Sequence, residues 1–479
     1  MTTNMAKIAA LVTPSERQIS WNEMEFYGFI HFTVNTFTNQ EWGDGSESPA
    51  IFNPTAFDAH QWVDTCKLAG MSGLILTCKH HDGFNLWPTQ LTEHSVKNSP
   101  WRDGRGDMVK EVADACREGG IKFGVYLSPW DRHEPSYGDS EVYNEFFVGQ
   151  LKELLTGYGE IFCVWFDGAC GEGPNGKKQV YDWDRYYEVI RELQPNAVIS
   201  VCGPDVRWCG NEAGHTRTSE WSVVPASMLD NEKIQENSQQ VDDGMFAKRV
   251  PSQDEDLGSR GVVEAADGLA WYPAEVNTSI RPGWFYHPQE DDQVRSTDEL
   301  LDIYYGSVGG NGTFLLNLPP TPSGRIHEHD VQRMKELGDV LRHTFATDLA
   351  VDVKASCSSM LDEHHHANRV VDERTDTWWS APEGMEEAWI ELDLGEEHSI
   401  DHAVLMEHIR SGQRIERFRL ECRGEEEEWT EISSGTVVGY KKILRFPAVH
   451  ARFIRLMIEE SRWCPTLQKF GVYYAGKNC

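Results

Sequence analysis

The stretch EIFCVWFD, residues 160–167, is an apolar and aromatic run of strand length that ends on an aspartate. The segment before it, EVYNEFFVGQLKELLTGYG (141–159), carries apolar residues at spacings of three and four, which is typical of an amphipathic helix. A helix followed by a continuously apolar strand is the unit of a parallel sheet with both faces buried. This stretch therefore predicts an α/β protein with Asp167 at the end of a buried strand.

The same unit recurs on both sides of this stretch. Further apolar runs of strand length are FYGFIHF (26–32), SGLILTC (72–78), IKFGVYLS (121–128), AVISVCG (197–203) and GTFLLNL (312–318). Amphipathic helical patterns lie between most of them, and their repetition predicts a TIM-like (β/α)8 barrel over residues 1–346. The segment 204–296 is polar, so the sixth and seventh strands cannot be placed, and we expect the barrel to be irregular there.

The pattern of the chain changes after HDVQRMKELGDVLRHTF (329–345), which is the last helical stretch. Short segments with alternating apolar and polar residues follow, among them AWIELDL (388–394) and RFIRLMI (452–458). Such segments, separated by turn residues, are typical of antiparallel strands. The sequence therefore predicts a second domain, a β-sandwich (discoidin-like jelly roll) over residues 347–479.

The composition argues against several classes of partner. The chain has 479 residues, 17 Trp and a formal net charge of -33. This charge repels nucleic acid and anionic membrane surfaces, and no apolar run reaches the roughly 20 residues of a membrane span. The 11 cysteines are scattered without CxxC pairs, which predicts reduced thiols and no disulfide framework or zinc site. We expect no nucleic-acid or membrane partner.

The first residues, MTTNMAKIAALVTPSERQ (1–18), lack the extended apolar region of a signal peptide. We therefore expect a cytoplasmic protein, or a periplasmic or secreted one if a leader precedes this sequence. Nothing in the sequence defines an oligomeric state.

Two carboxyl groups at the mouth of a barrel are the minimum equipment for glycoside hydrolysis. Asp167 is the first candidate, because the active site of a barrel forms at the carboxyl ends of its strands. The segment GPDVRWCGNEAG (203–214) follows the fifth strand, flanks Glu212 with glycines and adds Trp208 as a platform for a sugar ring. We interpret Glu212 as the acid/base. Other acidic residues of this polar region stay open as the second carboxylate: Asp205, Glu220, Asp254, Glu255 and Glu275.

Two adjacent histidines, His80 and His81, follow the second predicted strand. Neighbouring side chains of an extended segment point to opposite sides, so we expect that these two do not bind one metal ion together. Neutral imidazole offers one donor and one acceptor, which suits the hydroxyl groups of a sugar. A metal-dependent hydrolase stays open as an alternative, with His31, His80 and Asp167 converging from three strands.

Five motifs occur in the order EFYGFIHFTVNTFTNQEWGDGSESP (25–49), LTCKHHDGFNLWPT (76–89), GVYLSPWDRHEPSYG (124–138), VWFDGACGEG (164–173) and GPDVRWCGNEAG (203–214). Together they resemble the family 29 glycoside hydrolases, the α-L-fucosidases, and in particular their α-1,3/1,4-specific subfamily. The resemblance implies a retaining exo-α-L-fucosidase that acts on a fucosylated oligosaccharide or glycoconjugate. It implies that Asp167 is the nucleophile and Glu212 the acid/base, and that no metal or organic cofactor is required. The two carboxyl groups of a retaining enzyme lie about 5 to 5.5 Å apart.

The same resemblance implies which residues bind the fucose. Positions that match the family's fucose subsite are His31, Glu41, Trp42, His80, His81 and Tyr126. Trp284 is similar to the tryptophan that faces the C5 methyl group of the sugar. A pocket selective for fucose needs convergent polar groups beside an apolar wall, and these residue types supply both.

The C-terminal segments ANRVVDERTDTWWSA (367–381) and AWIELDLGEEHSIDHAVLMEH (388–408) resemble the F5/8 type C, or discoidin-like, domains. Many such domains hold a structural calcium ion through the loop that matches 368–377 and through a glutamate near the last strand. This chain has Lys469 at that glutamate position, and an ammonium group cannot ligate calcium. The sequence therefore argues against calcium near Asp372. We expect the domain to pack on the barrel.

A function from a different class stays open. The chain could be a carbohydrate-binding protein on a catalytically silent barrel, but such a protein would not need both Asp167 and Glu212, and both are present. Insensitivity to EDTA distinguishes the glycosidase from the metal-dependent hydrolase.

Overall fold

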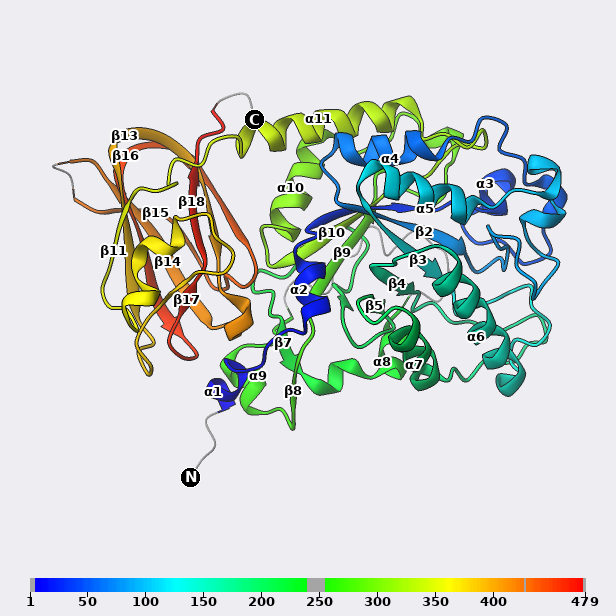
Figure 1. Ribbon diagram of the computed structural model, residues 1–479, viewed down its shortest axis with the longest axis horizontal. Helices are drawn as coiled ribbons and strands as arrows, with labels where there is room; N and C mark the ends of the chain where they lie inside the picture. Colours follow the sequence, from blue (N-terminus) through cyan, green and yellow to red (C-terminus); the bar gives the residue numbers. More distant parts are fainter. Residues whose placement is uncertain (1–4, 239–254, 426–427, 477–479) are drawn as a thin grey trace.

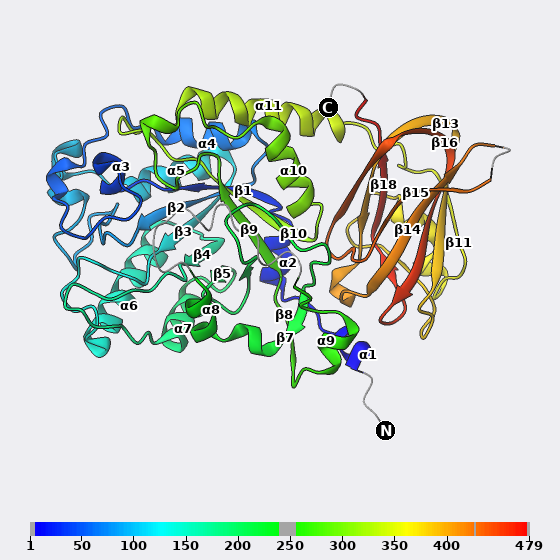
Figure 2. The same cartoon turned by 180° about the vertical axis from the view of Figure 1, so that it is seen from behind.

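The computed structural model describes residues 5–238, 255–425 and 428–476. Figure 1 shows two bodies side by side, a barrel surrounded by helices and an all-β domain, and Figure 2 shows them from behind. Helix α11 (Glu328–Thr344) runs along one edge of the barrel toward the second domain. None of the described helices is both long and apolar enough to cross a membrane.

Eight parallel strands form the barrel. They are β1 (Phe26–Ile30), β2 (Gly73–Lys79), β3 (Lys122–Leu127), β4 (Cys163–Phe166), β5 (Val198–Val201), β6 (Arg207–Trp208), β9 (Ala274–Ser279) and β10 (Gly312–Asn317). Their order in the sheet is β5-β4-β3-β2-β1-β10-β9-β6. A parallel bridge between Ser200 and Val206 connects the end of β5 to the start of β6. The sheet is therefore nearly closed, and the predicted TIM-like barrel is confirmed.

The six strands that the sequence places all occur, within a few residues of the predicted bounds. The two that could not be placed are β6, which has only two residues, and β9, whose sequence AEVNTS is largely polar. All six residues of β9 are nevertheless buried. Glu275 and Asn277 share the face of β9 that points into the barrel, and these polar residues hide the strand from a search for apolar runs.

Helices cover the outside of the barrel. The main ones are α4 (Ala59–Leu68), α5 (Met108–Gly119), α6 (Ser140–Gly157), α7 (Trp183–Leu193), α10 (Thr297–Ser307) and α11. Aspartates define where several of them begin: Asp58 accepts a hydrogen bond from the backbone N–H of His60, and Asp107 accepts one from Lys110. Such N-caps satisfy backbone donors that have no partner within the helix.

The remaining short elements of the first body lie at its N-terminus and in its loops. They are α1 (Met5–Ala9), α2 (Glu16–Asn22), α3 (Val34–Thr38), β7 (Val223–Pro225), α8 (Asn231–Asn237), α9 (Arg260–Glu264) and β8 (Leu269–Trp271).

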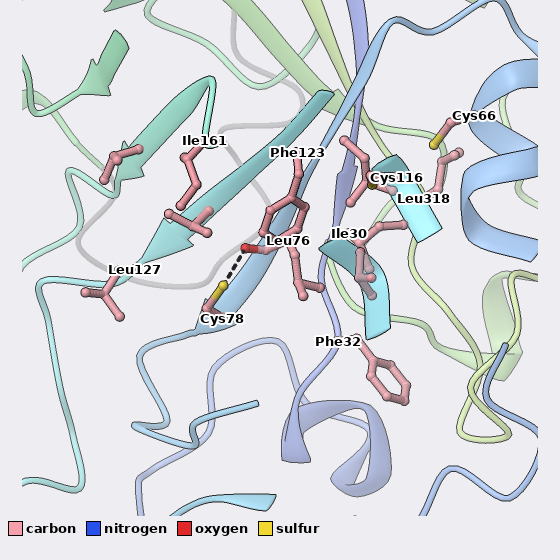
Figure 3. Close-up of a cluster of buried hydrophobic side chains, with 14 of the residues drawn as sticks. Ile30, Phe32, Cys66, Leu76, Cys78, Cys116, Phe123, Leu127, Ile161 and Leu318 are labelled. Carbon is pink, nitrogen blue, oxygen red and sulfur yellow. Dashed lines mark hydrogen bonds between the residues drawn. The ribbon is translucent and has the colours of Figure 1, made fainter. Parts of the chain in front are cut away.

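The strand residues alternate between two apolar shells. Side chains on the outer face, such as Ile30, Leu76 and Phe123, pack with residues of the surrounding helices, as Figure 3 shows. Side chains on the inner face, such as Tyr27 and Trp165, fill the barrel itself. This alternation follows from the two-residue period of a strand. It directs every second side chain near the strand ends toward the barrel mouth.

The second domain is antiparallel. Its strands are β11 (Lys354–Cys357), β12 (Trp379–Ser380), β13 (Ala388–Met406), β14 (Ile415–Arg423), β15 (Thr430–Gly435), β16 (Lys442–Ser461), β17 (Thr466–Leu467) and β18 (Lys469–Tyr473). The long strands β13 and β16 pair along most of their length, β14 pairs with β16, and β18 pairs with β13. Its separate core contains Trp379, Leu392, Phe418 and Leu456. The ten cysteines within the described residues of both domains are free thiols.

The β-sandwich packs against the barrel through apolar and polar contacts, and its Val404, Ile443 and Tyr473 join the outer apolar cluster of the barrel. The Asn311 side chain accepts a hydrogen bond from the backbone N–H of Tyr440 at 2.7 Å and donates one to the carbonyl of Glu220 at 2.8 Å. Gln413 accepts a hydrogen bond from the backbone N–H of Ser222 at 2.8 Å. Because these groups are buried, their pairing fixes how the two domains meet.

Candidate active site

A pocket lies at the carboxyl ends of the barrel strands, where TIM-like barrels place their active sites. Its empty volume is about 600 Å³, open solvent at the mouth included, which is within the usual range for small-molecule sites. Of the predicted site residues, those that line it are His31, Glu41, Trp42, His80, His81, Asp167, Trp208, Glu212 and Trp284. Residues from five different strand ends and loops thus converge as the sequence predicts.

Asp167 follows β4 directly and has a well-defined set of partners. Its Oδ1 accepts a hydrogen bond from the backbone N–H of Ala169 at 2.8 Å, and its Oδ2 accepts one from the Tyr126 hydroxyl at 2.9 Å. Burial raises the pKa of the carboxyl above its ordinary value, and these two hydrogen bonds offset part of that shift. The side chain is 23% exposed, on the pocket side. Asp167 therefore both orders the turn and presents a carboxylate to a ligand.

Tyr126 is the one predicted subsite residue that does not line the pocket. It is fully buried on β3, behind Asp167, and its ring stacks on Trp165 with 5.2 Å between the ring centroids. Burial beside the Asp167 charge raises the pKa of its hydroxyl well above the usual range, so the hydroxyl keeps its proton. Tyr126 therefore supports Asp167 from behind the pocket lining, and its direct contact with the sugar stays a prediction.

Glu212 occupies the loop after β6, and its carboxylate faces the pocket. Its Oε2 accepts a hydrogen bond from the indole N–H of Trp284 at 3.1 Å. Its backbone carbonyl accepts one from the Thr278 hydroxyl at 2.7 Å. Trp284 thus holds the side chain of Glu212, and Thr278 holds its backbone.

The other acidic residues of the polar segment are used elsewhere. Asp205 pairs with Arg191, Glu220 with Arg207 and Arg217, and Glu255 also with Arg217. Glu275 lies inside the barrel and does not reach the pocket. Asp254 lies outside the described residues. Among the described candidates, Glu212 is the carboxylate that shares the pocket with Asp167.

Glu41 has a structural task at the rim of the pocket. Its carboxylate accepts hydrogen bonds from the backbone N–H groups of Trp284 and Phe285, at 2.8 and 2.9 Å. His287 Nε2 lies 2.7 Å from the same carboxylate. Glu41 thereby fixes the loop that carries Trp284, a link across 243 positions that no sequence pattern indicates.

Two pocket histidines have ring orientations set by their hydrogen bonds. His31 Nδ1 lies 2.9 Å from the amide oxygen of Asn317, which can only accept, so this nitrogen carries the proton. His81 Nδ1 lies 2.7 Å from the Ser128 hydroxyl, which itself donates to the carbonyl of Trp130. Burial lowers the pKa of both imidazoles to about 3, so both are neutral. Each therefore keeps Nε2 as an acceptor for a donor such as a sugar hydroxyl.

His80 and His81 do not point to opposite sides as expected. Their ring centroids lie 4.1 Å apart, and both rings line the pocket. Strand β2 ends at Lys79, so both histidines belong to the following turn, where the alternation of a strand no longer applies. Ligand atoms of His80, His81 and Asp167 lie within 4.8 Å of one another, which is close enough for a metal ion.

The β-sandwich loop does not offer a calcium site that fits its residues. The Asp372 carboxylate accepts hydrogen bonds from the Thr377 hydroxyl at 2.9 Å and pairs with Arg369 at 3.4 Å. The ammonium group of Lys469 pairs with Asp348 at 3.1 Å. A calcium ion requires six to eight oxygen ligands, and here two cationic side chains hold the carboxylates instead.

Comparison with known proteins follows the same division of the chain. The sequence profile described as Alpha-L-fucosidase matches residues 10–344, and the profile of the F5/8 type C domain matches residues 354–467. The chain belongs to the alpha-L-fucosidase family. This fucosidase is 41% identical to Alpha-L-fucosidase 1 of Arabidopsis thaliana over 469 residues, which cover 97% of this chain and 88% of that protein.

Solved structures resemble the fucosidase over its whole length. A putative alpha-L-fucosidase from Bacteroides ovatus is 46% identical, with a TM-score of 0.86 over 100% of this chain and 77% of that one. A Ruminococcus gnavus GH29 fucosidase in complex with fucose is 31% identical, with a TM-score of 0.84 over 97% of this chain and 95% of that one. The chain is therefore a glycoside hydrolase, and its substrate contains fucose.

Several residues of the fucosidase pocket were not predicted from the sequence. Phe29 and Trp165 contribute to its lining, and Asn277 lines it while accepting a hydrogen bond from the Trp208 indole at 2.8 Å. Phe29 and Trp165 each lie two residues before a predicted site residue, His31 and Asp167. Since side chains two apart share a face of a strand, this spacing was the signal that could have found them.

Proposed function

We propose that this member of the family is a retaining exo-α-L-fucosidase that removes terminal fucose from α-1,3 or α-1,4 linkages of branched glycans. The observation that carries the proposal is that Asp167 and Glu212 line one pocket and are held by different donors. Asp167 receives the Tyr126 hydroxyl and the Ala169 N–H, and Glu212 receives the Trp284 indole. Two separately oriented carboxyl groups can take two different roles.

The reaction proceeds by double displacement. A carboxylate oxygen of Asp167 attacks the anomeric carbon as the bond to the leaving oxygen breaks, and protonated Glu212 gives that oxygen its proton. Glu212 then accepts a proton from water, which attacks the anomeric carbon and releases Asp167. The neutral His31 and His81 accept hydrogen bonds from the sugar hydroxyls through Nε2. No metal or cofactor takes part in these steps.

The lining of the pocket supports removal of a terminal sugar. Phe29 and Trp165 are almost fully buried and belong to the apolar cluster that fills the barrel, so the pocket has a floor. A sugar with further residues attached on that side would have no room for them. The indoles of Trp42, Trp208 and Trp284 supply apolar walls, which suit the methyl group and the C–H faces of fucose.

The linkage preference rests on the loop that carries Glu212. The motif RWCGNEAG (207–214) is the one that resembles the α-1,3/1,4-specific subfamily, and it includes Trp208, which stands beside Glu212 in the pocket. The position of the Glu212 carboxyl relative to the Trp208 ring determines which leaving sugars can receive its proton. The likeness of this loop to the α-1,3/1,4-specific subfamily therefore supports action on the branched linkages.

The test uses two isomeric oligosaccharides, one a branched Lewis-type glycan with α-1,3/1,4-linked fucose and one with α-1,2-linked fucose. Release of fucose from the branched substrate alone is the expected result. Proton NMR of the first turnovers should show α-fucose, since a double displacement keeps the anomeric configuration. Early β-fucose would exclude the retaining mechanism, and release from neither glycan would favour a binding protein.

A metal-dependent hydrolase is the second candidate, because His80, His81 and Asp167 converge as described. Removal of metal with EDTA, followed by addition of Zn²⁺, separates the two. The glycosidase is expected to keep its activity throughout, whereas loss and recovery would make Asp167 a metal ligand.

A further inference from the structure

Glu275 on β9 is a fully buried carboxyl group that the proposed mechanism does not use. Its Oε2 accepts a hydrogen bond from the Tyr27 hydroxyl at 2.5 Å, and its Oε1 accepts one from the indole N–H of Trp165 at 2.7 Å. The Ser200 hydroxyl donates to the same Oε1 at 3.3 Å. No cationic side chain within the described parts of the chain forms an ion pair with it. A buried carboxyl without a cation is costly in its charged form, and burial raises the pKa of Glu275 to about 7, so the group is fully ionised only above neutral pH.

The carboxyl lies one layer of side chains below the pocket. Glu275 and Asn277 are two residues apart on β9, so they share the inner face of the barrel at a separation of roughly 7 Å. Asn277 lines the pocket and Glu275 does not. The same relation holds on β1, where Tyr27 lies two residues below Phe29. Glu275 and Tyr27 therefore form the layer on which the pocket floor rests.

Trp165 connects this layer to the reacting groups. Its N–H is bound to Glu275, and its ring lines the pocket and stacks on Tyr126. The Tyr126 hydroxyl donates in turn to Oδ2 of Asp167. Trp165 and Tyr126 thus lie between the buried Glu275 carboxyl and Asp167. The positions of both aromatic rings depend on that buried carboxyl.

We propose that Glu275 is a positioning residue that fixes the indole of Trp165 under the sugar and, when it is ionised, supplies negative charge beneath it. The inference rests on the proposed glycoside hydrolysis, whose transition state carries positive charge on the ring oxygen and the anomeric carbon. A negative charge in a site that excludes water stabilises that charge more than it stabilises the neutral substrate. A carboxylate bound to the indole N–H also makes the ring face toward the sugar more electron-rich, which favours a cation above it.

The Glu275→Gln variant isolates the charge, because the local contacts allow an amide. The amide oxygen can accept from Trp165 and Ser200, and the amide nitrogen can donate to the Tyr27 oxygen. The Tyr27 hydroxyl then has Thr313 Oγ1, at 3.1 Å, as an acceptor. The hydrogen bond from the Trp165 indole is therefore kept while the charge is removed, and the Tyr27 oxygen, which already accepts the Trp21 indole N–H at 2.9 Å, takes the amide as a second donor. A purely structural role predicts unchanged kcat in this variant.

The test measures kcat, KM and thermal unfolding of the full chain with an aryl α-L-fucoside at about pH 8, where the Glu275 carboxyl is ionised. The wild type must turn over the substrate, and no turnover would overturn the proposed function and this inference with it. With an active wild type, Glu275→Gln is expected to lose at least fivefold in kcat, with KM within threefold and a melting temperature that is unchanged or higher. A smaller loss in kcat, or a loss that accompanies a lower melting temperature, would overturn the inference about Glu275 and leave the proposed function in place.

Two further variants show whether the effect passes through Trp165. Trp165→Phe keeps a ring and removes the N–H, and the double variant with Glu275→Gln is expected to be no more than threefold slower than the slower single variant. If the losses in kcat of the two single variants multiply in the double variant, the effect of Glu275 does not pass through the Trp165 indole. The matched control is Glu407→Gln, another fully buried carboxyl that accepts three backbone N–H groups in the β-sandwich. Its kcat is expected within twofold of the wild type, and an equal loss there would count against a specific role of Glu275.

Discussion

The indole N–H of Trp284 donates a hydrogen bond to Oε2 of Glu212 at 3.1 Å, although the two residues lie on different loops. The backbone N–H of Trp284 is bound by Glu41, and its carbonyl accepts a hydrogen bond from the Asn317 side chain at 2.8 Å. Trp284 is thus fixed at three atoms. This arrangement lets one side chain act both as an apolar wall of the pocket and as the support for the acid/base.

Replacing Trp284 with Phe should impair the acid step selectively. The ring keeps most of the apolar wall, but Glu212 loses the donor that orients its carboxylate, which is worth roughly 1 to 3 kcal/mol, or about 5- to 150-fold. We expect kcat/KM to fall by about that factor for oligosaccharides, whose leaving oxygen needs a proton. For an aryl fucoside with an acidic phenol as the leaving group the loss should be less than threefold. Equal losses for both substrates would show that Trp284 acts only as a wall.

Replacing Glu41 with Gln should weaken substrate binding through the Trp284 loop. An amide oxygen can accept the N–H groups of Trp284 and Phe285 only in part, because the amide nitrogen must face one donor or His287. We expect kcat/KM to fall by about tenfold or more, mainly through KM. Intrinsic tryptophan fluorescence should lose its response to fucose in parallel. An unchanged KM would mean that the loop keeps its position without this carboxylate.

The parts of this protein that the sequence predicts are those where apolar patterning decides the structure. Five barrel strands and the strand that ends on Asp167 are continuous apolar runs, since both faces of each are buried. Strand β9 could not be predicted from apolar patterning, because Glu275 and Asn277 point into the barrel, where polar side chains serve the pocket. The irregular part of the barrel therefore contributes polar side chains to the pocket, beside residues from the ends of the regular strands.

The residues alone indicated the part of the site that follows strands, whereas Glu41, Trp42 and Trp284 on the loops were indicated only by the family resemblance. Asp167 and Glu212 were found because strand ends meet at one face of a barrel. The hydrogen bond from Tyr126 to Asp167 could not be predicted, because it depends on the register between β3 and β4. The bond between Glu41 and Trp284 joins two loops, and loop geometry is not written in hydrophobic periodicity.

The Tyr126→Phe variant should change the pH dependence of the enzyme. The Tyr126 hydroxyl donates to ionised Asp167, which favours the charged form and lowers the pKa of a carboxyl that burial raises. Removing the donor must therefore raise that pKa further. We expect the acid limb of kcat/KM to move to higher pH, with a lower plateau. An acid limb that stays in place would indicate that another group controls it.

Calcium should have no effect on the stability of this protein. Lys469 and Arg369 hold the carboxylates of Asp348 and Asp372, so a cation would have to displace two ammonium or guanidinium groups. We expect the melting temperature in 5 mM CaCl₂, a concentration of about the range that weak calcium modules require, to equal that in EDTA. A Lys469→Met variant, which removes one of the competing cations, serves as the control. A clear rise in melting temperature of the wild type with calcium would contradict this assignment.

Glu407 should make the stability of the β-sandwich depend on pH in a defined direction. Burial raises the pKa of its carboxyl from 4.5 to about 7, although three backbone N–H groups and Arg414 favour the charged form. Because the folded pKa lies above the unfolded one, the contribution of this group is fully present below pH 4.5 and is lost as the pH rises to about 7.

Glu407→Gln lacks this dependence. It also loses an acceptor for the Gly439 N–H, a cost of about 1 to 3 kcal/mol. We therefore expect the variant to be less stable than the wild type at pH 4.5. Between pH 4.5 and 7 the difference in unfolding free energy should shift in favour of the variant by up to about 3 kcal/mol. Above pH 7 this difference should not change further. Urea unfolding of both proteins across this range checks the prediction, and a difference that does not vary with pH would contradict it.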